Sequence, residues 1–134
     1  MIVLDASAVV ELLLGTAEGS WVAGRIANER ESLHAPHLLD VEVASALRRY
    51  EASRIMTPAR AAQALTDFES IEIARYAHDV LLTRIWQLRR NVSAYDAAYV
   101  ALAEVLDAPL LTGDGKLARA AGHHARMEWI GARR

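Results

Sequence analysis

Short apolar runs that end in an acidic residue constrain the fold of this chain more than any other feature. Asp5 follows the apolar run at 1–4, and Asp114 closes a second run at 109–113. Runs this short and uninterrupted are typical of strands that are buried on both faces of a parallel sheet. Ligands of open α/β sheets bind beyond the carboxyl ends of the strands, so we expect both acids to face one cavity.

Segments of helical periodicity separate these runs from further strand candidates. Strands are predicted at 1–4, 32–35, 71–74, about 109–113 and 127–129, and helices at 7–14, 20–29, 38–53, 59–68, 77–90, 94–107 and 115–121. Strands that alternate with helices predict an α/β fold, a three-layer α/β/α sandwich around a central parallel sheet of about five strands. The length of 134 residues predicts a single domain over 1–134.

Composition excludes several kinds of site and location. The chain contains no cysteine, so disulfides and thiolate metal sites are excluded and only oxygen and imidazole ligands remain. The longest apolar stretch, 97–103, is far shorter than the roughly 20 residues that span a bilayer, which predicts no membrane segment. No Lys- or Arg-led apolar leader opens the sequence, so we expect a cytoplasmic protein.

The charge balance bears on nucleic-acid binding. A formal net charge of −2 and a pI near 6.2 argue against broad, charge-driven binding. Lys116 is the only lysine, and arginine supplies the other positive charges, including the doublets Arg48–Arg49, Arg89–Arg90 and Arg133–Arg134. Arginine binds phosphate through its planar fork, so the doublets are candidates to flank an acidic crevice and hold an RNA backbone. Charge pairs of this kind are more often solvated helix faces.

Four carboxylates, Asp5, Glu42, Asp96 and Asp114, lie where a predicted strand ends or a predicted helix begins. Asp114 could simply cap a helix, Asp96 could complete a capping box, and Glu42 could interact with a helix dipole. Asp5 is hardest to explain in this way, since an acid directly after a buried strand loses its water unless a cation or donors compensate. One site for a hard cation, Mg²⁺ or Mn²⁺, accounts for all four acids together.

Four motifs follow one another along the chain: Ile2-Val3-Leu4-Asp5-Ala6-Ser7, Glu42-Val43-Ala44-Ser45-Ala46-Leu47, Tyr95-Asp96-Ala97-Ala98-Tyr99 and Leu111-Thr112-Gly113-Asp114-Gly115-Lys116-Leu117. In this order they resemble PIN domains, and in particular the VapC toxins of bacterial toxin–antitoxin pairs. The resemblance runs from residue 1 to about residue 130. It implies a metal-dependent endoribonuclease with Mg²⁺ or Mn²⁺ as cofactor, RNA as substrate, a homodimer, and a cognate antitoxin protein as partner.

The resemblance also implies roles for individual residues. It assigns the four carboxylates to the family's acidic quartet and places Ser7 and Thr112 at hydroxyl positions near the site. A helix cap and a strand-end residue are the structural alternatives for these two hydroxyls. Many relatives carry a further polar or acidic group after the last acid, where this chain has Gly115 and Lys116. Whether the site holds one metal or two therefore stays open.

The residues suggest a division of labour. Our hypothesis is that three aspartates, Asp5, Asp96 and Asp114, position the metal. Glu42 would then ligate the metal or orient the attacking water, and Arg49 would contact phosphate.

Two competing functions remain. An aspartyl-phosphate phosphatase would require an acid two positions after its first, where Ser7 stands. A catalytically degenerate domain would bind RNA or a partner protein without cleaving.

Other side chains are assigned to structure. All five histidines are interpreted as surface or partly buried, because the spacing of His34 and His37 and the adjacency of His123 and His124 suit no regular metal site. Apolar residues over 61–86 exceed what one small core can bury, which predicts an association surface. Three tryptophans are interpreted as core or interface packing: Trp21, Trp86 and Trp129.

Overall fold

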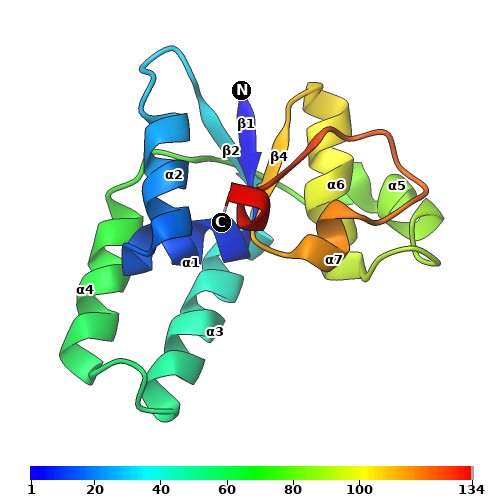
Figure 1. Ribbon diagram of the computed structural model, residues 1–134. Coiled ribbons are helices and arrows are strands. Elements are labelled where there is room, and N and C mark those ends of the chain that lie inside the picture. The colour runs from blue at the N-terminus through cyan, green and yellow to red at the C-terminus, as the bar shows by residue number, and fades with distance from the viewer. Residues whose placement is uncertain (134) are drawn as a thin grey trace.

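A central five-stranded sheet organises the protein, and the computed structural model describes residues 1–133 of it (Figure 1). The strands are β1 (Ile2–Leu4), β2 (Leu33–Pro36), β3 (Ala74–Tyr76), β4 (Leu110–Thr112) and β5 (Met127–Trp129). Their order across the sheet is β3-β2-β1-β4-β5, and every pairing is parallel. All five carboxyl ends therefore lie at one edge, as the sequence predicted.

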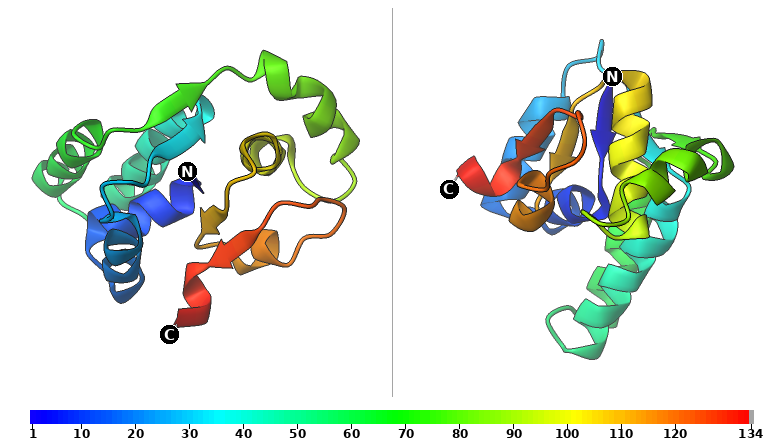
Figure 2. Two further views of the ribbon diagram at one scale, coloured as in Figure 1. Left: turned by 90° about the horizontal axis from the view of Figure 1, so that it is seen from above. Right: turned by 90° about the vertical axis from the view of Figure 1, so that its right-hand side faces the viewer.

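Helices lie on both faces of this sheet. They are α1 (Ala6–Leu14), α2 (Ala17–Ile26), α3 (Leu38–Ala52), α4 (Pro58–Glu69), α5 (Leu82–Gln87), α6 (Ala94–Leu106) and α7 (Gly115–Ala118), with 3₁₀ turns η1 (Asp79–Leu81) and η2 (Ile130–Arg133). Helix α6 packs against β1, β2 and β4, while α1 and α2 lie on the opposite face (Figure 2). Helices α3 and α4 pair and project beyond the carboxyl edge of the sheet (Figure 1). The predicted three-layer α/β/α fold is thus confirmed.

The core explains why the strand sequences are uninterrupted apolar runs. All three residues of β1 and all three of β4 are buried, since both strands lie between helices. Residues 97–103 of α6 are also buried, and their four alanines let the helix lie close to the sheet. No helix among residues 1–133 combines the length and the apolar character that crossing a membrane requires.

Local signals set most helix boundaries. Thr57 caps α4 by accepting a hydrogen bond from the Arg60 N–H, and Pro58 follows at the first helical position. Gly15 ends α1 with a φ of 67°, a left-handed conformation that glycine adopts without strain. Helix α2 begins at Ala17 rather than at residue 20, because Thr16 caps it through the Gly19 N–H.

Two predicted elements were misplaced. The third strand lies at 74–76 rather than 71–74, because β2 selects the register and pairs Pro36 with Tyr76. The helix predicted at 77–90 is the turn η1 followed by the short helix α5. Leu81, Ile85 and Leu88 are buried at helical spacing. The helical periodicity predicted for this segment was therefore correct, but the predicted helix was too long.

Candidate active site

Four acidic side chains stand at the carboxyl edge of the sheet. Asp5 directly follows β1, and Asp114 follows β4 after Gly113. These two strands are neighbours, with Leu4 beside Leu111. Asp96 lies in the first turn of α6 and Glu42 in the second turn of α3, so four different elements supply the four acids.

Asp5 is the most buried of these acids. Its carboxylate accepts hydrogen bonds from the Ser7 hydroxyl at 2.6 Å and from the Ala8 N–H at 3.0 Å. Burial raises the pKa of Asp5 to about 6, although hydrogen bonds from Ser7, Thr112 and the Ala8 N–H oppose the rise. The negative charge of Asp96 raises the pKa further. Asp5 therefore retains its proton to an unusually high pH.

Asp96 lies within the electrostatic influence of the other acids. The pKa of Asp96 is raised first by burial and then by the charges of Asp114 and Glu42. Since Asp96 also acts on Asp5, it links all four carboxylates electrostatically. The Asp114 carboxylate caps α7 by accepting hydrogen bonds from the Lys116 N–H at 2.9 Å and the Leu117 N–H at 3.4 Å. Asp114 therefore does cap a helix, as the structural alternative predicted, and it also remains part of the acidic cluster.

Tyr99 is a site residue to which sequence reasoning gave no role. Its buried hydroxyl donates a hydrogen bond of 2.5 Å to Glu42. Burial, followed by the contact with Glu42, raises the pKa of Tyr99, so the phenol stays protonated and orients the carboxylate. Tyr99 lies three residues after Asp96 on α6, hence on the same helical face, and this spacing was the available signal.

Two hydroxyl groups connect the ends of β1 and β4. Ser7 donates to Asp5 and accepts from the Gly113 N–H at 2.8 Å. Thr112 accepts from the Asp114 N–H at 3.0 Å, and its oxygen lies 3.4 Å from that of Ser7. The loop that carries Asp114 is therefore tied to the loop that carries Asp5.

Two hollows adjoin the acids. One, of about 270 Å³, is lined by Ala6, Ser7, Val10, Glu11, Glu42, Ser45, Ala46, Arg49 and Tyr50. The other, of about 380 Å³, is lined by Arg89, Arg90, Asn91, Val92, Ser93, Asp96, Asp114, Lys116, Leu117 and Ala120. The guanidinium of Arg49 donates to Ser45 at 3.2 Å and borders the hollow that contains Glu42. The doublet Arg133–Arg134 falls outside the residues whose side chains the structure describes.

The donor set has the chemistry of a hard-cation site, since four carboxylates converge without any thiolate. Within residues 1–133, however, no three acidic or imidazole side chains already stand close enough to bind one ion. The Asp114 carboxylate is held by α7 and the Glu42 carboxylate by Tyr99. Binding one ion therefore requires these carboxylates to turn toward Asp5 and Asp96.

Trp129 explains the glycine after the last acid. A Cβ atom at Gly115 would lie 2.7 Å from the Trp129 ring and 3.0 Å from the Arg119 guanidinium. The position therefore accepts no larger side chain without repacking. Among the tryptophans predicted to pack in a core or an interface, Trp21 and Trp129 are partly buried, while Trp86 is 66% exposed and therefore lies outside the core.

The histidine interpretation also needs one correction. His34 is buried rather than at the surface, because β2 lies inside the sheet. Its ring nitrogens contact the hydroxyl groups of Ser32 at 2.6 Å and Tyr76 at 2.7 Å. Burial lowers the pKa of His34, so it remains neutral at physiological pH and serves as a structural group within the sheet.

Comparison with known proteins decides the family, because the sequence profile of the PIN domain matches residues 2–123. The chain belongs to the PIN domain family. Ribonuclease VapC12 of Mycobacterium tuberculosis is 42% identical over 130 residues, which cover 97% of this chain and 99% of the relative. Ribonuclease VapC1 of the same species is 47% identical over 121 residues, or 90% of each chain.

Solved structures agree on the fold of this PIN domain. PAE2754 from Pyrobaculum aerophilum superposes with a TM-score of 0.70 at 23% identity, covering 98% of this chain and 85% of its own. VapBC2 from Rickettsia felis, bound to a promoter DNA fragment, gives a TM-score of 0.65 at 14% identity, with 96% and 98% covered. The predicted family, fold and endoribonuclease class are confirmed. VapC ribonucleases of this family generally depend on a divalent metal.

Proposed function

We propose that this PIN domain is the toxin of a toxin–antitoxin pair and cuts RNA at the cluster of Asp5, Glu42, Asp96 and Asp114. The observation that carries the proposal is the gathering of four carboxylates from four elements at one edge of the sheet, where burial and then neighbouring carboxylates raise the pKa of Asp5 and of Asp96. A like-charge cluster of this kind costs free energy unless a cation is bound. We propose Mg²⁺ as that cation, with Mn²⁺ as a substitute, because the donors are all oxygen.

The residues of the cluster would divide the work as follows. Asp5, Asp96 and Asp114 would hold the ion, which, when bound, acidifies a water and offsets charge on the phosphoryl oxygens. Tyr99 holds the Glu42 carboxylate, which can then ligate the ion or orient the attacking water. Arg49 borders the same hollow as Glu42 and would contact a phosphate of the strand.

The proposed protein partner is a cognate antitoxin. Support comes from the groove between α3 and α4, which is lined by Ala44, Leu47, Arg48, Glu51, Pro58, Ala61, Ala62 and Leu65. Leu65 and the nearby Ile55 are exposed although apolar, as expected of a surface that another chain covers. The VapBC2 structure is an example of a toxin–antitoxin pair that includes a protein of the same fold. A homodimer and a cytoplasmic location complete the proposal.

Cleavage of total cellular RNA by the purified protein tests the assignment. Wild-type protein should produce discrete fragments with Mg²⁺ or Mn²⁺ and none with a chelator. Asp5→Asn should reduce the rate by at least about 100-fold, because a ligand of the proposed ion is lost. Asp67→Asn, an exposed aspartate on α4 that hydrogen-bonds Gln63, is the matched control and should cut normally.

Full activity of Asp5→Asn, or cutting in the chelator, would contradict the proposed mechanism. A folded wild-type protein that cuts no RNA under either metal would favour the degenerate binding domain instead. Circular dichroism of each variant separates loss of the site from loss of the fold.

A further inference from the structure

The hollow beside Asp96 and Asp114 differs in charge from the one beside Glu42. Three cationic side chains line it, Arg89 and Arg90 from the α5–α6 connection and Lys116 from α7. All three are exposed. Two of the four acids thus share a cavity of about 380 Å³ with three of the four cationic side chains that line the two hollows.

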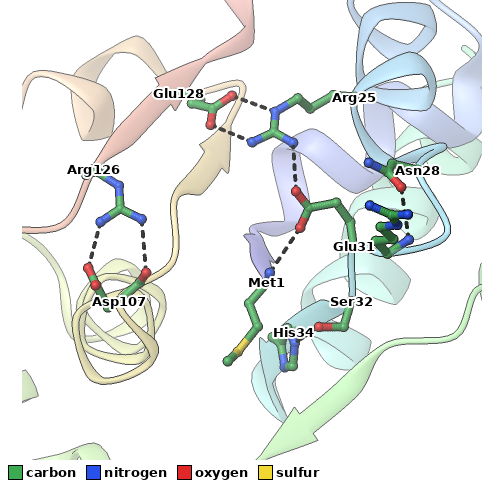
Figure 3. Close-up of polar contacts among 10 residues, drawn as sticks. Met1, Arg25, Asn28, Glu31, Ser32, His34, Asp107, Arg126 and Glu128 are labelled. Atoms are coloured by element: carbon green, nitrogen blue, oxygen red, sulfur yellow. Dashed lines mark hydrogen bonds and ion pairs between the residues drawn. The ribbon is translucent and has the colours of Figure 1, made fainter.

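The cations of this hollow are not engaged within the protein as other arginines are. Arg25, Arg75, Arg84 and Arg126 each form an ion pair with a carboxylate at 3.0 Å or less. Figure 3 shows two of these pairs, Arg25 with Glu128 and Arg126 with Asp107. Among residues 1–133, by contrast, the side chains of Arg90 and Lys116 form no ion pair, not even with Asp96 or Asp114.

An aromatic surface continues the hollow past Arg89. The Arg89 guanidinium lies 4.4 Å from the centroid of the Trp86 ring and donates to the Trp86 carbonyl at 2.8 Å. Trp86 is 66% exposed, so its indole is open to solvent beside Arg89, which lines the hollow. Cations beside an exposed aromatic ring match single-stranded RNA, whose phosphates take the charge and whose bases stack.

We infer that the hollow lined by Arg90 and Lys116 holds the backbone of single-stranded RNA next to the scissile phosphate, while Trp86 stacks on a base of that strand. The inference rests on the proposed nuclease function and assigns the strand a path over α5 and α7. Because the whole chain carries a net charge of −2, affinity for RNA has to come from such local groups. Arg49, in the other hollow, lies on the opposite side of the acids along this path.

Salt dependence of binding distinguishes a phosphate contact from a structural effect. Each phosphate contact with a single strand contributes about 0.7 to the slope of log K against log salt concentration. The probe is a fluorescein-labelled single-stranded RNA of mixed sequence, titrated with the full chain in chelator at several KCl concentrations. Fluorescence anisotropy reports binding without cleavage.

Arg90→Gln and Lys116→Gln should each weaken binding several-fold and lower the slope by about 0.7. Trp86→Ala should weaken binding roughly fivefold or more with the slope unchanged, because stacking involves no counterion. Arg30→Gln is the control, since Arg30 is an exposed arginine in the loop before β2, at the other end of the sheet. It makes the same change of charge and should bind like the wild type.

The two proposals fail differently in these experiments. Asp5→Asn should bind the probe at least as tightly as wild type. A variant that binds RNA but no longer cuts it would therefore report on the metal site and not on the RNA path. Wild-type affinity and slope for both Arg90→Gln and Lys116→Gln would overturn the inferred RNA path while leaving the nuclease intact. In that case the cations and Trp86 would form a surface for a protein. A wild-type chain that binds no RNA would overturn both proposals.

Discussion

At Asp5 the requirements of function and of stability oppose one another. The carboxyl group is buried, and its pKa rises from an ordinary 3.8 to about 6. Keeping it ionised at pH 7 therefore costs roughly 3 kcal/mol at most, at 1.36 kcal/mol for each unit of pKa. The hydrogen bonds from Ser7 and the Ala8 N–H offset only part of the cost of burial.

Asp5→Asn should consequently stabilise the metal-free protein at neutral pH while abolishing cleavage. The amide keeps an oxygen that can accept from Ser7 and from the Ala8 N–H, but it carries no buried charge. We expect the free energy of unfolding in chelator to rise by about 1–3 kcal/mol at pH 7. Urea unfolding measures this difference, and a variant less stable than wild type would refute it.

The stability difference between Asp5→Asn and wild type should depend on pH. A group whose pKa is raised on folding contributes stability below its unfolded value of 3.8 and loses that contribution as pH rises through about 6. The advantage of Asp5→Asn over wild type should thus be near zero at pH 4, grow up to about pH 6 and level off above pH 7. Asp67→Asn, in an exposed position, should show no such growth.

At the scale of elements, the close approach of α1 and α2 depends on Gly19. A Cβ atom at this position would lie 2.0 Å from the Glu11 carbonyl oxygen and 2.6 Å from its carbon. Both are backbone atoms of α1, so the clash can be relieved only by moving a helix. Gly19 is therefore a packing position inside α2.

Gly19→Ala should therefore destabilise the protein by about 3 kcal/mol, because overpacking outweighs the gain in helix propensity. Gly24 offers a matched control in the same helix, since a Cβ there meets nothing within 4 Å. Gly24→Ala should raise stability by about 0.5–1 kcal/mol. Equal effects of the two substitutions in urea unfolding would contradict this account of α1–α2 packing.

Elements with strong local signals were predictable, and those decided by tertiary contacts were not. Helices α4 and α6 begin within one residue of their predicted starts, because Thr57 with Pro58 and Ser93 are strong local start signals. The position of β3 is set by its pairing with β2. The sequence of residues 71–76 alone does not indicate which of them pair. The exposure of Trp86 likewise depends on where α5 lies, and apolar character alone left a core and an interface as equal alternatives.

At the scale of the whole molecule, the two ends of the sheet carry opposite charge arrangements. Arg25 bonds Glu128 through two nitrogens at 3.0 Å, and Glu31 accepts from the Met1 amino group at 3.0 Å (Figure 3). Opposite charges are paired at this amino end, whereas carboxylates converge at the carboxyl end. The sequence predicted that convergence because parallel strands bring their carboxyl ends to one edge. It gave no role to Tyr99, whose contact with Glu42 joins α6 to α3.

If the proposed site binds its ion, a divalent cation should stabilise the folded state. An ion that binds only the folded protein contributes about 1.4 kcal/mol at ten times its dissociation constant. For a chain of 134 residues we expect the melting temperature to rise by about 3–6 °C in saturating Mg²⁺ over that in chelator. Potassium chloride of equal ionic strength screens the repulsion without occupying the site, so it should raise the melting temperature less.

Asp96→Asn separates occupation of the site from screening, because Asp96 is the acid coupled to all the others. Its removal should abolish most of the rise that Mg²⁺ gives beyond potassium chloride of equal ionic strength. Differential scanning calorimetry of both proteins in chelator, in Mg²⁺ and in matched salt makes the comparison. An equal rise with Mg²⁺ in the variant would mean that the ion binds elsewhere on the fold. No rise in wild type would mean that the four carboxylates do not draw together around a cation at this concentration.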